Sequence, residues 1–436
     1  MRGAKVDTKD DKGATPLELV ARGGMSAEEN KDMMEVAEIL IAHGANVNAP
    51  LAVAAGQNNL PMARLLIAHG ADVDGKGVNP PLFYTGVNAD NVEMAQLLVE
   101  SGARVNVKTS HGESPLHAAA FKGNIKVLNF LLAHGANPEV KDADGFTPLY
   151  YTAASDYCAT SAEALLNSGA DPNTKNTADL TALHQAAGQS ATKVVEILLS
   201  HKANINALDS QGHTPLSNAV EFGHGNVVEV LVDKGADVNL TNTRDRQSPL
   251  LKAIYRKYEP FIKLLLAHGA NPDPKIIGGG TLLYVAVGMD DGATSTEALL
   301  NYGADPNTKT FGGKTALYQA SAKGSTKVIE ILLAHKADIN ARDNQGNTPL
   351  YEAIAYGHAS VVELLVKRGA DVNLTNTNDE ETPLHKAISK GNIEIVKLLV
   401  ANGANVNAVS KAGITSLYFA RNFKDITELL KEHGAR

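Results

Sequence analysis

The stretch DSQGHTPLSNAVEFGHGNVVEVLVDKGADVN, residues 209–239, recurs in closely similar form as DNQGNTPLYEAIAYGHASVVELLVKRGADVN, residues 343–373. The offset from Asp209 to Asp343 also relates TSAEALLNSGADPNTK from Thr160 to TSTEALLNYGADPNTK from Thr294, which agree at 14 of 16 positions. Agreement over two separate stretches at one offset indicates a duplicated block, and we call this offset the duplication offset. Because a periodic chain can stack its units around one continuous core, its length of 436 residues does not fix a number of globular domains.

The block is itself built from shorter repeats, with a period of about 33 residues. Four successive repeats make up the duplication offset, as from Gly135 to Gly269. A Thr-Pro-Leu phrase or a close variant marks the middle of each repeat and recurs about 13 times between Thr15 and Thr415. A Gly-Ala pair, replaced by Lys-Ala at Lys202 and Lys336, marks the end. These pairs begin at Gly102, Gly135, Gly169, Gly235, Gly269, Gly303, Gly369 and Gly403.

Each repeat predicts two helices. In the repeat that starts at Ser114, the Ser-Pro-Leu phrase suits a helix start, because the hydroxyl accepts from an unpaired amide and proline fits the first helical position. Gly123 then ends a helix of about two turns. Apolar residues from Ile125 to Leu132 have helical spacing, and Gly135 is expected to close that second helix in a left-handed conformation. The Asn-, Asp- and Gly-rich stretch that follows is typical of an extended turn or β-hairpin loop.

These features together resemble the ankyrin repeat family. The resemblance rests on residues 209–239 and 343–373, which follow the family pattern nearly position for position. It implies an all-α repeat solenoid, in which ankyrin-type helix-turn-helix units carry projecting β-hairpin or loop fingers. One helix pair cannot bury its apolar face alone, so stacked neighbours share a core, and stability is approximately a sum of local and nearest-neighbour terms.

The whole chain, residues 1–436, is expected to form a single array with three parts. Residues 1–107 hold irregular repeats, because the first carries an acidic insertion between its helices and the second lacks most of its finger. Residues 108–408 hold regular repeats, including the four-repeat duplication, and residues 409–436 are interpreted as a C-terminal capping repeat. Gly3-Ala4 looks like the tail of a repeat whose helices are absent, which is compatible with a segment of a longer protein or with an improvised N-terminal cap.

The search for chemistry gives no support for catalysis, a cofactor or a metal. The net charge of −8 argues against a nucleic-acid partner. Cys158 is the single cysteine, so a reducing compartment such as the cytoplasm is expected. GGKT at residues 312–315 lacks the first glycine of a phosphate-binding loop, because that position is Thr308. We see neither an export signal nor an apolar stretch long enough to span a membrane, and we expect a non-enzymatic monomer.

Two sets of residues carry structural expectations. Lys202 and Lys336 stand where a left-handed glycine is expected, and adopting that conformation should cost each on the order of 1 kcal/mol relative to glycine. His117, His184 and His385 follow Thr-Pro-Leu-type phrases. In the family that the chain resembles, histidine at this place braces the finger to the helix, so we interpret all three as packing residues rather than metal ligands.

Function is therefore expected on the surface. Ankyrin-like arrays bind proteins with the fingertips and the exposed face of the first helix, and in this sequence those positions are rich in aromatic residues and arginine. Such side chains are enriched among interface hot spots, because they bring a large contact area at limited entropic cost. The candidate partner-binding residues are Phe121, Lys122, Ser210, Gln211, His213, Phe222, Arg244, Arg246, Tyr255, Arg256, Asn344, Gln345 and Tyr356.

The duplication allows one fingertip to be compared with its own copy. Residues 244–247 read Arg-Asp-Arg-Gln, with net charge +1, whereas residues 378–381 read Asn-Asp-Glu-Glu, with net charge −3. The stretch from Arg244 to Lys257 is also the most basic and aromatic part of the array. Different tips on a shared scaffold predict different tasks, and a solvated charged face is the alternative interpretation.

We expect a protein–protein interaction scaffold or adaptor that binds a protein or peptide along the concave surface and the fingertips. One alternative is an anionic ligand, either nucleic acid or lipid, bound through Arg244 to Lys257; the net charge and the acidic copy argue against it. Another is the recognition region of a larger multidomain protein, including an enzyme whose active domain lies outside this chain. A host-directed effector, acting in the host cytosol, is also compatible with the sequence.

Overall fold

The computed structural model describes residues 5–23, 27–76, 79–88, 92–244, 246–274, 276, 279–289 and 292–436, without the side chains of residues 27–30 and 88. The chain divides into two compact units, Met1–Asp237 and Val238–Arg436. Among the described residues there are 26 α-helices, one short 3-10 helix and no strand. This confirms the predicted all-α repeat class.

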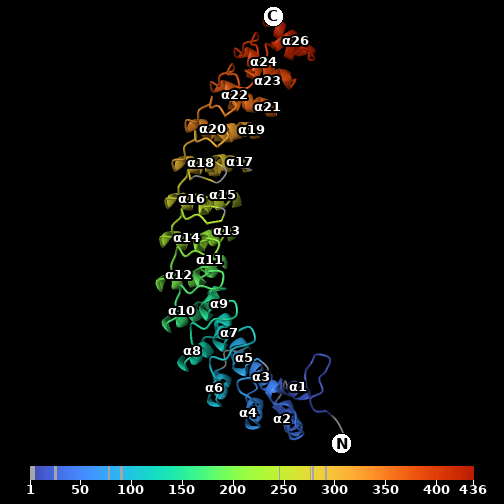
Figure 1. Cartoon of the computed structure of the whole chain (residues 1–436), viewed down its shortest axis with the longest axis vertical. Coiled ribbons are helices and arrows are strands. Elements are labelled where there is room, and N and C mark those ends of the chain that lie inside the picture. Colours follow the sequence, from blue (N-terminus) through green and yellow to red (C-terminus); the bar gives the residue numbers. More distant parts are fainter. Residues whose placement is uncertain are drawn as a thin grey trace. The chain divides into compact units, whose positions relative to one another are not determined.

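Within its described residues, the first unit (unit 1) is a stack of seven helix pairs (Figure 1). Each odd-numbered first helix packs on an even-numbered second helix, and first helices also pack on one another from pair to pair. The first helices are α1 (Pro16–Ala21), α3 (Asn48–Gly56), α5 (Pro81–Asn88), α7 (Pro115–Lys122), α9 (Pro148–Thr152), α11 (Ala182–Gly188) and α13 (Pro215–Phe222). The second helices are α2 (Ala27–Ala42), α4 (Leu60–Ala68), α6 (Val92–Glu100), α8 (Ile125–Ala133), α10 (Ala159–Asn167), α12 (Thr192–Ser200) and α14 (Gly225–Asp233), and η1 (Asp156–Cys158) precedes α10.

The second unit (unit 2) repeats this plan with six pairs among its described residues. The first helices are α15 (Pro249–Arg256), α17 (Leu282–Gly288), α19 (Ala316–Lys323), α21 (Pro349–Tyr356), α23 (Pro383–Ser389) and α25 (Ser416–Phe419). The second helices are α16 (Glu259–Ala267), α18 (Ala293–Asn301), α20 (Thr326–Ala334), α22 (Ala359–Lys367), α24 (Ile393–Ala401) and α26 (Lys424–Glu432).

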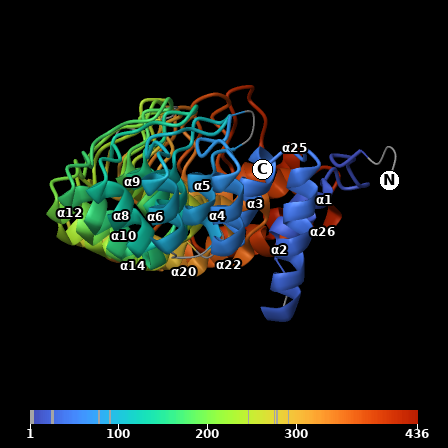
Figure 2. The same ribbon diagram turned by 90° about the horizontal axis from the view of Figure 1, so that it is seen from below.

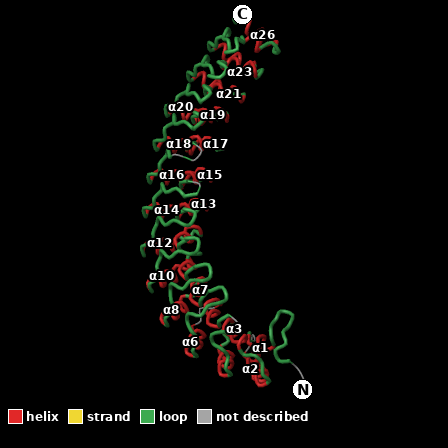
Figure 3. The backbone as a smooth tube through the Cα atoms, viewed as in Figure 1, coloured by secondary structure: helices red, strands yellow, loops and turns green. Residues whose placement is uncertain are grey.

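The fingers that connect successive pairs project from one side of the helices in each unit (Figure 2). They are turns rather than paired strands (Figure 3), and the one isolated β-bridge among the described residues joins Val409 and Thr415. Neighbouring fingertips are tied by backbone hydrogen bonds. In unit 1 the Ser210 N–H donates to the Ala178 carbonyl at 3.0 Å, and in unit 2 the Asn344 N–H donates to the Gly312 carbonyl at 3.0 Å. The tips therefore form an ordered row within each unit.

The Thr-Pro-Leu phrases start the first helices as predicted. The Thr214 hydroxyl accepts from the Ser217 N–H at 3.1 Å, and Pro215 occupies the first turn of α13. Its copy Thr348 accepts from the Tyr351 N–H at 3.2 Å at the start of α21. Each hydroxyl satisfies an amide that has no partner within its helix.

The helix ends carry the predicted left-handed residues. Gly135 has a φ of 84° after α8, and Lys202 and Lys336 both have a φ of 66° at the equivalent place after α12 and α20. The prediction of a left-handed conformation at these two lysines is confirmed. Lys257 also occupies a left-handed position, with a φ of 58° at the end of α15, where other repeats place glycine.

In six repeats an asparagine joins the end of its finger to the next repeat. The Asn173 side chain donates from Nδ2 to the Lys202 carbonyl at 3.3 Å and accepts from the Asn204 N–H at 2.6 Å through Oδ1. The Asn106 amide makes the same two contacts, with the Gly135 carbonyl at 3.1 Å and the Asn137 N–H at 2.8 Å. We call this arrangement the asparagine clamp. Equivalent clamps are formed by Asn239, Asn307, Asn373 and Asn407.

The first repeat departs from this plan. Its second helix, α2, has 16 residues where α4 has nine, and Figure 2 shows it extending beyond its neighbours. Part of the acidic insertion seen in the sequence thus continues α2. Among the described side chains of this helix, only Ala37 is buried, whereas Val36 and Ile39 are exposed. Gly3-Ala4 lies outside the described residues.

The left-handed lysines generate a stability prediction. Replacing Lys202 with glycine should raise the free energy of unfolding by about 1 kcal/mol, because glycine adopts positive φ without the steric penalty of a Cβ atom. Lys202→Ala is the matched control, since it removes the charge and keeps the penalty. Urea unfolding followed by circular dichroism should show a higher midpoint for the glycine variant alone. An increase in both variants would attribute the effect to the charge.

Candidate interaction surface

Four candidate residues are aromatic side chains at the C-terminal ends of first helices. Phe121 of α7 and Phe222 of α13 lie in unit 1 and are 50% and 60% exposed; Tyr255 of α15 and Tyr356 of α21 lie in unit 2 and are 45% and 63% exposed. The duplication offset pairs Phe121 with Tyr255 and Phe222 with Tyr356. Both copies therefore keep an exposed aromatic side chain at each of the two places. Exposed aromatic area that the fold does not bury is typical of binding surfaces.

Other candidates lie on the fingertips, at the N-terminal side of the same first helices. Ser210 and Gln211 lie before α13, and Asn344 and Gln345 lie before α21. His213 is half-buried, and its Nδ1 lies 3.3 Å from Oδ2 of Asp209, so it is partly engaged by the turn. In each unit, one repeat thus has polar candidates on the fingertip before its first helix and an exposed aromatic residue at the end of that helix.

Fewer basic side chains of the stretch from Arg244 to Lys257 are exposed than the sequence suggested. Arg244, Arg246 and Arg256 are exposed, but Lys252 from the same basic stretch is only 5% exposed. Asp245, between the two fingertip arginines, lies outside the described residues. Arg246 has a φ of 51° and its copy Glu380 a φ of 53°, so the basic and acidic tips have the same backbone turn at this point. The two tips differ in charge at a shared backbone position.

Lys122 lies beside the aromatic residue that precedes it. Its Nζ is 5.3 Å from the centre of the Phe121 ring, within the range of a cation–π contact.

Phe311 and Tyr157 are among the exposed aromatic side chains that the sequence did not single out. Phe311 is 80% exposed on a fingertip of unit 2, and its ring lies so close to Gly279 that a Cβ atom there would meet it at 2.0 Å. Tyr157 of η1 is also exposed and covers Gly123 in the same way. The available signal was the aromatic residue itself, at a turn position where most repeats carry a polar or small residue.

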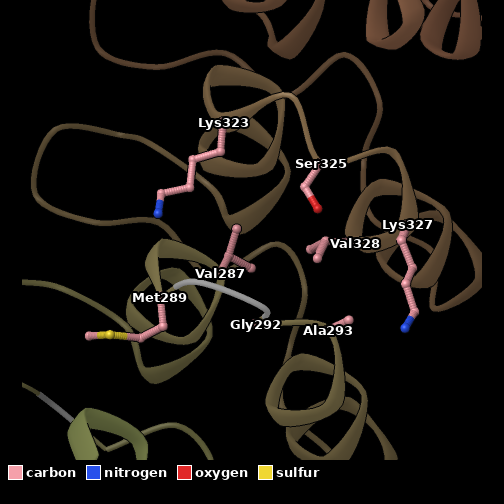
Figure 4. A pocket seen from close by; sticks show the side chains of 8 residues that line it. All are labelled: Val287, Met289, Gly292, Ala293, Lys323, Ser325, Lys327 and Val328. Atoms are coloured by element: carbon pink, nitrogen blue, oxygen red, sulfur yellow. The ribbon is translucent and has the colours of Figure 1, made fainter. Parts of the chain in front are cut away.

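Unit 2 contains a hollow of about 510 Å³, lined by residues in or next to α17, α18, α19 and α20. Figure 4 shows the side chains that line it. The ammonium groups of Lys323 and Lys327 lie on opposite sides of it. The Lys323 ammonium donates to the Gly288 carbonyl at the end of α17. One of the two cations that could attract an anion is thus engaged by the fold.

Groups that could support other chemistry are scarce in the part of the chain that the structure describes. There, no set of three or more His, Cys, Asp and Glu side chains is arranged to hold a metal ion. The helices in these ranges are too short or too polar for any of them to cross a membrane. Cys158 is buried, and burial raises the pKa of its thiol, which lowers its reactivity.

The three histidines after the Thr-Pro-Leu-type phrases are buried braces. The Thr181 N–H donates to Nδ1 of His184 at 3.2 Å, so Nδ1 is the unprotonated nitrogen, and Nε2 donates to the His213 carbonyl of the next finger at 3.1 Å. His117 and His385 make the same two contacts. Burial lowers the pKa of all three imidazoles, since it disfavours the charged form. Their predicted packing role is confirmed.

The chain is similar to known proteins in two comparisons, one with a family model and one with solved structures. A family model described as ankyrin repeats (3 copies) matches residues 24–109, 82–176, 151–242, 289–376 and 373–436. Among solved structures, the chain is similar to the crystal structure of the ankyrin repeat domain of Bcl-3, described as a unique member of the IkappaB protein family. That similarity has 26% sequence identity and a TM-score of 0.47, and it covers 51% of this chain and 100% of the other.

The histidine braces predict a pH dependence that the duplication can test. A histidine with a lowered folded-state pKa contributes stability above its unfolded pKa of about 6.5 and loses it as pH falls toward the folded value. His184→Tyr introduces the residue found at the copy position, Tyr318. Its urea midpoint should therefore fall less between pH 7.5 and 5.5 than that of the wild type. The reciprocal Tyr318→His variant should fall more, and equal slopes in all three proteins would contradict this assignment.

Proposed function

Because the chain belongs to the ankyrin-repeat family, whose repeats are generally protein–protein interaction modules, we propose that it is a non-enzymatic scaffold or adaptor. It binds a protein or peptide through the fingertips and the exposed ends of the first helices. The fold supplies a fixed row of such positions in each unit, and the residues placed there decide the partner.

The observation that carries this proposal is that two of the exposed aromatic rings stack on histidine rings of their own repeats. Phe222 stacks on His224 with ring centres 6.2 Å apart and an interplanar angle of 28°; Tyr356 stacks on His358 at 6.3 Å and 10°. The His224 Nε2 donates to the Gly188 carbonyl at 3.0 Å, so the ring beneath Phe222 is itself anchored to the neighbouring repeat. An aromatic side chain that is exposed yet held in place loses little entropy on binding.

We also propose that the protein works as a monomer in the cytoplasm. The single cysteine, Cys158, is buried and free, which suits a reducing compartment. The net charge of −8 favours solubility without association.

A second candidate function is binding of an anionic ligand at the basic fingertip. The exposed side chains of Arg244, Arg246 and Arg256 support it. The burial of Lys252 reduces the number of cations available, and the overall negative charge opposes it. A protein partner with an acidic segment fits the same arginines and is therefore the preferred ligand.

The aromatic positions can be tested one at a time. Phe222→Ala and Tyr356→Ala should each weaken binding of captured cytosolic partners by tenfold or more, which corresponds to about 1.4 kcal/mol. Because both side chains are largely exposed, the free energy of unfolding should stay within about 0.5 kcal/mol of the wild type.

Tyr302→Ala is the matched control, since Tyr302 is an exposed tyrosine after a second helix, α18. Quantitative mass spectrometry of captured proteins, followed by titration of the enriched ones, measures the effect. Equal losses in all three variants, or no loss in any, would argue against the first-helix ends as the binding surface.

The basic fingertip is tested by giving it the residues of the acidic fingertip at the duplication offset. Arg244→Asn and Arg246→Glu introduce the residues found at positions 378 and 380, and the backbone turn is matched at Arg246 and Glu380. Partners that use an acidic segment should be lost from this double variant. If the tip serves nucleic acid instead, the wild type should bind an oligonucleotide with a steep dependence on salt, and the variant should not.

A further inference from the structure

Unit 1 contains an aromatic cleft where one first helix is cut short. The helix α9 has five residues, whereas α7 and α13 have eight, and the chain turns away at Ala153 toward η1. A hollow of about 300 Å³ lies beside this turn, which we call the aromatic hollow. Its lining consists of Phe121, Phe146, Tyr150, Tyr151, Ala154 and Gln185.

The rings around this hollow hold one another in place. Tyr151 meets Phe121 edge to face, with ring centres 6.0 Å apart at 86°, and meets Phe146 at 6.1 Å and 83°. Phe146 stacks on Tyr150 at 4.5 Å and 28°. The Tyr151 hydroxyl donates to Oδ2 of Asp142 at 2.8 Å, and the Tyr150 hydroxyl donates to Oε1 of Gln185 at 3.0 Å. The hollow is thus built before any ligand arrives.

Carboxylates gather near this aromatic cluster. Oδ2 of Asp142 accepts from the Tyr151 hydroxyl at 2.8 Å, and Glu113 lines a second hollow together with Tyr151. Burial first, and then the hydrogen bond to Asp142 and the negative charges of Asp142, Glu113 and Asp144, raise the pKa of Tyr151. Asp144 is exposed on the fingertip. The residues that line the aromatic hollow are uncharged. The surroundings therefore favour a cation on an apolar surface.

A second hollow, of about 340 Å³, lies on the other side of the Phe121–Tyr151 pair. We call it the neighbouring hollow. Phe83, Val87 and Ala118 contribute apolar surface to its lining. Glu113, His117 and Lys122 also line it, and the opposite charges of Glu113 and Lys122 offset each other there. The apolar part of the lining therefore decides which side chain fits this hollow.

The duplicated copy shows which residues of this cluster the helix pair can form without. At the duplication offset, Val285 replaces Tyr151 and Gly280 replaces Phe146. The three carboxylates are absent from the copy as well, where the residues at the positions of Glu113, Asp142 and Asp144 are Gln247, Ile276 and Gly278. The same type of helix pair forms in both copies. Phe121 and Tyr150 remain aromatic in the copy, as Tyr255 and Tyr284. Asp142 also accepts from the Asp144 and Phe146 N–H groups within its own turn, so its loss accompanies a different finger in the copy. The replacement of Tyr151 and Glu113 leaves the helix pair in place, as expected of parts of a binding site.

We propose that unit 1 binds an extended segment of a partner protein that places an arginine or lysine side chain in the aromatic hollow and an apolar side chain, two residues away, in the neighbouring hollow. The aliphatic stem of the basic side chain packs on the rings, and its cation faces the carboxylates. Side chains two residues apart on an extended strand point to the same side, roughly 6–7 Å apart. This inference rests on the proposed protein-binding function and specifies its partner.

The test uses fluorescein-labelled nonapeptides of serine and alanine that carry leucine and arginine two residues apart, in both orders. Fluorescence polarisation should show at least tenfold tighter binding of one order than of the same peptide with glutamine for arginine. A peptide with four residues between leucine and arginine controls for spacing and should bind as weakly as the glutamine peptide. Equal binding of the arginine and glutamine peptides, or no binding of either, would overturn the proposal.

Two variants assign the binding to this cleft. Tyr151→Val introduces the residue of the copy and should weaken binding about tenfold. Glu113→Gln with Asp144→Asn removes two charges while keeping side-chain size, so the preference for arginine over glutamine should shrink severalfold even if Tyr151→Val destabilises α9. Wild-type affinity in both variants would overturn the proposal.

Capture from cytosolic lysate with the same proteins separates this inference from the proposed function. If Phe222→Ala or Tyr356→Ala loses partners that Tyr151→Val retains in full, the scaffold function stands and the aromatic cleft is refuted. If the wild type enriches no protein over a blank resin, the proposed function itself fails.

Discussion

A polar side chain at the end of each described finger accepts a backbone N–H of the next repeat, and in six repeats it is the asparagine of a clamp. The carbonyls at the end of a helix have no partner within that helix, and the asparagine clamp supplies one from the preceding repeat. In the clamp of Asn173 the same amide also accepts a backbone N–H of the following finger. The direction in which each finger leaves its helix is therefore fixed by the repeat before it. The apolar core holds the helices together, whereas the clamp positions each finger relative to the finger of the next repeat.

The clamp is the same whether the second helix ends in glycine or in lysine. The Lys202 and Lys336 carbonyls accept from Asn173 and Asn307, as the Gly135 carbonyl accepts from Asn106, and both lysines keep the left-handed conformation. A Cβ atom at the equivalent glycines, such as Gly135 and Gly169, would meet nothing within 4 Å. The free-energy cost of lysine at these positions therefore comes from its backbone conformation and not from a clash of its side chain.

Much of this architecture could be predicted from the sequence, because it depends on contacts that recur with the repeat. Thr214 predicts a helix start and His184 predicts a brace, and both act on neighbours at fixed spacing. The aromatic cleft could not be predicted in this way. It depends on the early end of α9 and on the meeting of Phe121, Phe146 and Tyr151 from three different segments. Likewise, the burial of Lys252 depends on its neighbours in space and not on its place in the repeat.

The row of fingertip hydrogen bonds has a consequence for how such a protein changes over generations. In the described residues the fingertip bonds join immediate neighbours, so a whole number of repeats can be inserted or removed without altering the bonding of the others. The copied block consists of four complete repeats, so it keeps the phase of the array. Recombination can thus lengthen the row of fingertips first, and point mutations can afterwards change the charge of each new fingertip.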